Sequence, residues 1–142
     1  MDESKLTMAQ QIARTAGAYQ KLRTGRAPKT VTVVLSNDTL VITLHDALTP
    51  AEQELSKSPA GAARVQEFHR QLFADSVDPM REEISKITGI QVREAAAEVD
   101  TTTGTVVHAF TNGTMVQVFL LAKGMSQIEW NGDKVCECDA TQ

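Results

Sequence analysis

The residues best suited to chemistry include a basic stretch in the N-terminal third of the chain. Arg23, Arg26 and Lys29 lie close together, and Arg14 and Lys21 precede them. Guanidinium and ammonium groups bind phosphates, carboxylates and anionic membrane surfaces. We therefore treat Arg23, Arg26 and Lys29 as candidate binding residues. A solvated helix end is the competing interpretation, because the stretch lacks the dense basic cluster typical of lipid binding.

Two further segments carry polar groups that could meet a ligand. The segment from Thr49 to Glu52 has the pattern of a helix capping box, whose amides and carboxylate could also bind an anion or a partner. The segment from Asp100 through Thr101 and Thr103 to a glycine offers a carboxylate and hydroxyls at an expected hairpin tip. Helix capping and turn formation are the alternative explanations for these residue types. We keep all five named residues as candidate ligand-binding or partner-binding residues.

Catalytic and metal-binding patterns are missing from the sequence. It contains no Walker, dinucleotide-binding, zinc-protease or nucleophile-elbow motif. His45, His69 and His108 lack ligand spacing, so we interpret them as surface or boundary residues. Cys136 and Cys138 form a lone pair near the C-terminus, interpreted as reduced and partly exposed. We predict no catalytic residue, no metal and no cofactor; an enzyme that combines the acidic turn with a histidine is the least favoured alternative.

Length and composition restrict the class of protein. The chain has 142 residues, a formal net charge of -4 and a pI near 5.3. An acidic balance argues against nucleic acid as a partner. No run of 18 apolar residues is present, and polar residues interrupt any signal-peptide core within residues 1–20. We expect one soluble, cytoplasmic domain over residues 1–142, with no transmembrane segment.

Hydrophobic periodicity in the first third predicts a helix followed by a hairpin. Apolar residues at spacings of three and four predict a helix over 4–23, with Ser4 as its N-cap and Gly25 at its end. Segments 30–36 and 39–45 are rich in β-branched residues and flank an Asn-Asp turn, as in a two-residue β-hairpin.

The middle of the chain reads as helical. A short helix is expected from the capping box to about residue 57, and an apolar stripe predicts a second helix over 60–88. Pro79 lies inside the second segment. It should either kink one helix or open a new one, with Asp78 as the N-cap.

The last third reads as strand again. Strands are expected over 90–99, 105–111 and 114–121, and an Asn-Gly pair suggests a small final hairpin of 127–130 with 133–137. The resulting order is α-ββ-αα-βββ. We predict the α+β class, with a mainly antiparallel sheet of about four to five strands and helices on one face.

Several short motifs occur in an order that resembles a known family. They are Gly25-Arg26-Ala27-Pro28-Lys29, then residues 48–55 and 88–92, and then Asp100-Thr101 with Thr103-Gly104. Together they resemble the MpsC-like family, named for a Na+-translocating membrane-potential-generating system and formerly a domain of unknown function. The resemblance covers about residues 4–111 and leaves 112–142 as a C-terminal β extension. The chain departs from the family in the spacing of Gly25 and Pro28 and in having alanines at 95–97, where a histidine is common.

The resemblance implies a non-enzymatic accessory or regulatory domain of a membrane ion or inorganic-carbon transport system. A membrane transporter subunit is then the candidate partner, and the domain would lie peripheral to the inner membrane. A small-ligand or KH-like nucleic-acid-binding module is the alternative, although the Gly-x-x-Gly loop of KH domains is missing. The apolar run 114–121 suits a buried strand, but an exposed edge as apolar as residues 115–121 would seek a partner, so we expect a homo-oligomer, with a dimer favoured.

Overall fold

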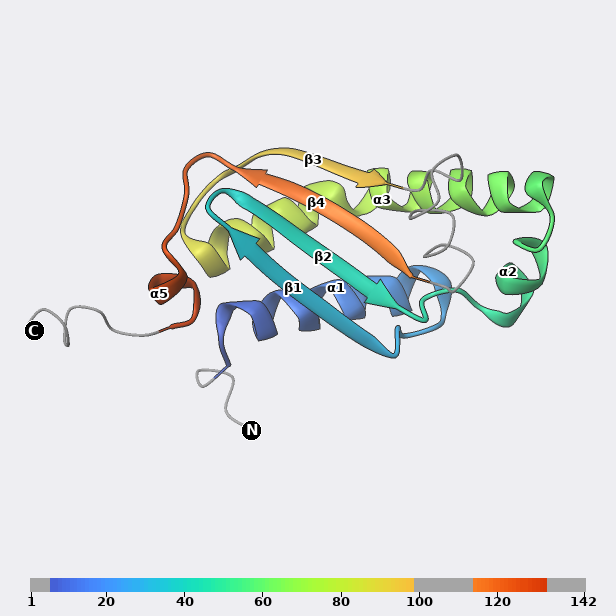
Figure 1. Ribbon diagram of the computed structural model, residues 1–142, viewed down its shortest axis with the longest axis horizontal. Coiled ribbons are helices and arrows are strands. Elements are labelled where there is room, and N and C mark those ends of the chain that lie inside the picture. Colours follow the sequence, from blue (N-terminus) through green and yellow to red (C-terminus); the bar gives the residue numbers. More distant parts are fainter. Residues whose placement is uncertain (1–5, 99–113, 133–142) are drawn as a thin grey trace, which may run out of the picture.

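The computed structural model describes residues 6–98 and 114–132, which form two layers (Figure 1). One layer is a four-stranded antiparallel sheet in the order β1-β2-β4-β3, and the other consists of the two long helices α1 and α3. The elements are α1 (Met8–Thr24), β1 (Thr30–Ser36), β2 (Thr39–His45), α2 (Pro50–Leu55), α3 (Pro59–Thr88), β3 (Val92–Glu98), β4 (Met115–Leu121) and α5 (Gln127–Trp130). The predicted α+β class, antiparallel sheet and helix-covered face are confirmed.

Short polar residues begin the helices, and glycines end the long ones. Thr7, not Ser4, caps α1: its hydroxyl accepts the amide of Gln10, whose side chain accepts the amide of Thr7 in return. That reciprocal pairing fixes the start of α1 at residue 8 rather than 4. Gly25 ends α1 and Gly89 ends α3, both with positive φ, where glycine carries no steric penalty.

Pro79 lies within a continuous α3 and neither ends that helix nor starts a new one. Because proline lacks an amide proton, the carbonyl of Asp75, four residues earlier, loses its helical hydrogen bond. The guanidinium of Arg23 donates to that carbonyl at 3.4 Å. The side chain of α1 thus supplies the donor that Pro79 removes from α3, and the expectation of a helix capped by Asp78 is wrong.

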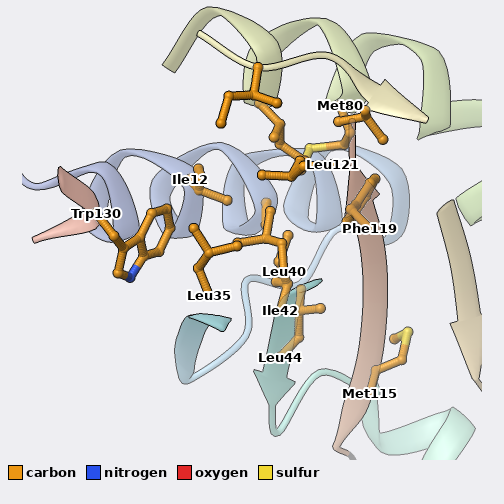
Figure 2. Packing of buried hydrophobic residues seen from close by; sticks show 14 of the residues in the cluster. Ile12, Leu35, Leu40, Ile42, Leu44, Met80, Met115, Phe119, Leu121 and Trp130 are labelled. Carbon is orange, nitrogen blue, oxygen red and sulfur yellow. The ribbon is translucent and has the colours of Figure 1, made fainter. Parts of the chain in front are cut away.

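The apolar core lies between the sheet and the two long helices (Figure 2). Alternate residues of the strands point inward, so Leu40, Ile42 and Leu44 of β2 are buried while their neighbours are half-buried. Phe119 and Leu121 of β4 meet them from the adjacent strand, and α1, α3 and α5 close the core from the helical side. This alternation is the one expected of a sheet covered on a single face.

Two predictions for the C-terminal third are wrong. Residues 127–130 form the helix α5 with Ser126 as its N-cap, rather than a strand of a final hairpin. The run Met115–Leu121 is the buried strand that its composition suits and not an exposed edge, because β4 pairs with β2 on one side and with β3 on the other. The expected strand 105–111 and residues 133–137 lie outside the described residues.

Candidate functional site

The most chemically distinctive contact joins Glu52 at the start of α2 to His69 in the middle of α3. Glu52 Oε2 and His69 Nε2 are 2.8 Å apart. The His69 side chain is 1% exposed and that of Glu52 is 12% exposed. A carboxylate can only accept, so Nε2 carries the proton of this hydrogen bond. The interpretation of His69 as a surface or boundary residue is therefore corrected: it is buried and hydrogen-bonded to an acid.

The same carboxylate caps α2. Glu52 Oε1 accepts the amide of Thr49 at 2.8 Å, and the Thr49 hydroxyl accepts the amide of Glu52 at 3.2 Å. The predicted capping box is confirmed, with Pro50 in the first turn. Both oxygens of Glu52 are thus used, one within α2 and one across to α3.

The electrostatics of Glu52 favour its ionised form. Burial alone would raise the pKa of the carboxyl, but the hydrogen bonds from His69 and from the Thr49 amide, helped by the charge interaction with His69, hold the pKa below its usual value. A lowered pKa means that the ionised carboxylate belongs to the folded state. The pair fastens α2 to α3, an important link because none of the residues of α2 is fully buried.

Polar residues also gather behind His69, where α1, α3 and β4 meet. Gln20, Ser76 and Gln117 are all buried and, with His69, line a cavity of about 20 Å³. Within the described part of the chain, the side-chain nitrogen of Gln20 has no hydrogen-bond partner. Polar groups buried in this way normally find a partner or an ordered water. Helical periodicity places His69 one turn after Val65 and two turns before Ser76, on the buried face of α3, and so could have indicated its burial. The spacing of residues gives no indication that Glu52 is its partner.

The basic stretch is largely occupied by contacts within the protein. Arg26 forms a 3.0 Å ion pair with Asp46 and also reaches the Asp46 carbonyl, while Arg23 binds the carbonyl that Pro79 leaves free. The side chain of Lys29 stands exposed, and its amide donates to the His45 carbonyl. Arg23 and Arg26 therefore bind other segments of the chain, and the stretch does not form an open site for an anion.

The remaining candidates from the sequence are the acidic turn, two histidines and two cysteines. Asp100, Thr101 and Thr103 lie outside the described residues, as do His108 and the two cysteines. The ring of His45 instead lies 3.1 Å from the Thr32 hydroxyl. In the ranges 6–98 and 114–132, no three histidine, cysteine or acidic side chains gather closely enough to hold a metal ion.

A larger groove opens between α1 and the C-terminal half of α3. It has a volume of about 450 Å³, and Leu22, which is 74% exposed, lies at its wall. Arg14, Tyr19 and Glu83 add polar groups to a mainly apolar lining that also contains Leu6 and Ile87. Its size falls in the usual range for pockets that bind small molecules.

Comparison with known proteins identifies a family to which this chain is similar. Residues 4–113 match the family described as Na+-translocating membrane potential-generating system (MpsC). The chain belongs to the MpsC family. It is also 26% identical over 110 residues to the uncharacterized protein YbcI of Bacillus subtilis (strain 168), an alignment that covers 78% of this chain and 89% of the relative. No solved structure matches.

The MpsC match ends where β4 begins. Its last residue, 113, directly precedes the described segment with β4 and α5. Because β4 is an inner strand of the sheet, part of the predicted C-terminal extension is integral to this fold. Among the described helices, none has the length and apolar character required to cross a bilayer.

Proposed function

We propose that this MpsC-family chain is a non-enzymatic accessory domain that regulates a membrane ion or inorganic-carbon transport system from the cytoplasmic side. Family membership carries the proposal, since the family is described as part of a Na+-translocating, membrane-potential-generating system. The partner would be an integral membrane subunit of that system.

The geometry of the Glu52–His69 pair supports a non-enzymatic role. A general acid or base has to come within hydrogen-bonding distance of its substrate. The His69 side chain is almost fully enclosed, and both oxygens of Glu52 are already engaged. The pair therefore has the contacts of a structural fastener and lacks access for a substrate.

Capture from native membranes tests the proposal. The tagged chain is incubated with gently solubilised membranes, and bound proteins are identified by mass spectrometry, with an unrelated acidic α+β domain of similar size as the control. The expected result is selective recovery of a polytopic membrane protein. Adding the purified chain to vesicles that contain that protein should then change the rate of Na+ or bicarbonate uptake. Recovery equal to that of the control domain would overturn the proposal.

Binding of a small molecule is the second candidate function, and the groove beside Leu22 favours it. An Ala18→Trp variant would fill this groove, because Ala18 belongs to its lining. Metabolite screening by thermal shift should give a hit with the wild type that disappears in the variant. A nucleic-acid role has weaker support, because Arg23 and Arg26 are engaged within the chain.

A further inference from the structure

The two edges of the sheet differ in how they are protected from pairing with another strand. At one edge, β3 has an irregular register between Val92 and Glu94, and it carries charged Arg93 and Glu94 side chains. Arg93 also pairs with Asp38 at 3.3 Å. Bulges and charges are the usual means by which proteins block an exposed edge. The β3 edge is therefore protected.

The opposite edge, β1, lacks these features. Its sequence, Thr-Val-Thr-Val-Val-Leu-Ser, contains no charged residue and no proline, and its pairing with β2 is regular along its whole length. In the part of the chain that the structure describes, no strand pairs with the outer side of β1. Figure 1 shows β1 and β3 as the two margins of the sheet. An uncharged, regular, seven-residue edge is a template for strand addition.

The backbone groups that face outward can be identified from one hydrogen bond. The Gln127 side chain of α5 donates to the Leu35 carbonyl. The backbone N–H and C=O groups of Leu35 therefore point away from β2. Because these groups alternate in direction along a strand, those of Val33 and Val31 also point outward. Thr30, Thr32 and Val34 direct theirs toward β2. Because the Leu35 carbonyl is already occupied, the outward backbone groups of Val31 and Val33 are the ones that the described residues leave for a partner.

We propose that β1 pairs antiparallel with β1 of a second copy, forming one continuous sheet across a two-fold axis at Thr32. In this register Val31 and Val33 of each copy exchange backbone hydrogen bonds with Val33 and Val31 of the other. Thr32 then faces Thr32, and Thr30 faces Val34. A second copy is the favoured occupant for two reasons. The Thr-Val alternation is complementary to itself, and a strand without charge adds no local repulsion between two chains of net charge -4.

The sheet face that none of the described elements covers is consistent with this arrangement. Thr30, Thr32 and Val34 lie on it, beside Val41 and Thr43 of β2, and Val34 is 53% exposed. Pairing at the edge would join these two faces into one surface over β1 and β2, whose strands contain no acidic residue, lysine or arginine. A single new strand pair also leaves α1 and α3 in place on the other side.

Cysteine cross-linking tests the register directly. Thr32→Cys is introduced into a chain whose Cys136 and Cys138 are replaced by serine, and Thr43→Cys in the same background is the control. Cysteines facing each other across an antiparallel pair have the Cα separation that a disulfide requires. The expected result is a disulfide dimer for Thr32→Cys and none for Thr43→Cys. Equal cross-linking of both variants would point to stacking of the open faces instead and would overturn the proposal.

Sedimentation equilibrium provides a second, independent readout. Wild type should approach twice the 15.4 kDa chain mass as its concentration rises. Thr32→Lys opposes two like charges at the axis and should raise the dimer dissociation constant at least about fivefold, whereas Thr43→Lys should leave it nearly unchanged. Circular dichroism checks that both variants fold. A wild type that stays monomeric at millimolar concentration would refute β1 pairing, while leaving the proposed transport role, tested by membrane capture, untouched.

Discussion

Removing the carboxylate of Glu52 should destabilise the domain far more than removing the carboxylate of a glutamate in an exposed capping box. The hydrogen bond to His69 spans 2.8 Å in a nearly enclosed site. A hydrogen bond to a charged group contributes about 1.5–3 kcal/mol, and loss of a cap costs about 1 kcal/mol. Glu52→Ala should therefore cost about 2.5–4 kcal/mol. Glu52→Gln keeps an acceptor for the Thr49 amide and should cost about 1–2 kcal/mol.

Urea denaturation followed by circular dichroism measures these free energies of unfolding. The matched control is Glu129→Ala, because Glu129 occupies the same position in the capping box of Ser126 but lies exposed on α5. It should cost only about 0.5–1 kcal/mol. A double-mutant cycle between Glu52→Ala and His69→Leu should give a coupling of about 1–3 kcal/mol. If Glu52→Ala costs no more than Glu129→Ala, or the coupling falls below about 0.5 kcal/mol, the assigned role of the pair is wrong.

Three further predictions concern pH, backbone space and the proline in α3. The pKa of Glu52 is lowered in the folded protein, so the carboxylate stabilises the fold above its unfolded pKa of 4.5 and loses this effect as pH falls through its folded pKa. The difference in free energy of unfolding between wild type and Glu52→Gln should therefore become smaller in acid unfolding titrations. Gly61→Ala would place a Cβ against the Leu55 carbonyl of α2 and should lower the melting temperature by several degrees. Gly17→Ala meets only ordinary contacts and should keep or raise the melting temperature. Arg23→Met should lower the free energy of unfolding by about 0.5–1 kcal/mol in the wild type. In a Pro79→Ala background the loss should be smaller, because residue 79 again donates its amide to the Asp75 carbonyl. Equal losses in urea titrations of both backgrounds would contradict that account.

Local signals in the sequence were sufficient for much of the fold. The bounds of β1 and β2 follow from their β-branched residues, and the Thr49 cap of α2 follows from a short polar residue before a proline. These features depend on interactions within a few residues of chain. The Ser126–Glu129 pattern carries the same capping signal, but the Asn131-Gly132 pair is also typical of a hairpin turn, and the hairpin prediction is the wrong one for α5.

The features that sequence could not supply depend on contacts between distant segments. Apart from Gln117, both faces of β4 are apolar, so its composition could not distinguish an inner strand from an edge strand. The contact between Glu52 and His69 joins separate helices, and the Arg23 bond to α3 spans still more of the chain. In each case the partner is set by how α1, α2 and α3 pack, which no local pattern encodes.

The attachment of α2 has a consequence for how the native domain opens. A helix of six residues that buries none of them gains little from the hydrophobic effect. Its amide protons should therefore exchange with solvent through a local detachment that leaves the sheet, α1 and the rest of α3 intact. Acidification weakens the Glu52 carboxylate that joins this helix to α3, so it should release α2 before the remainder of the molecule melts. Glu52 would then determine which part of the domain unfolds first.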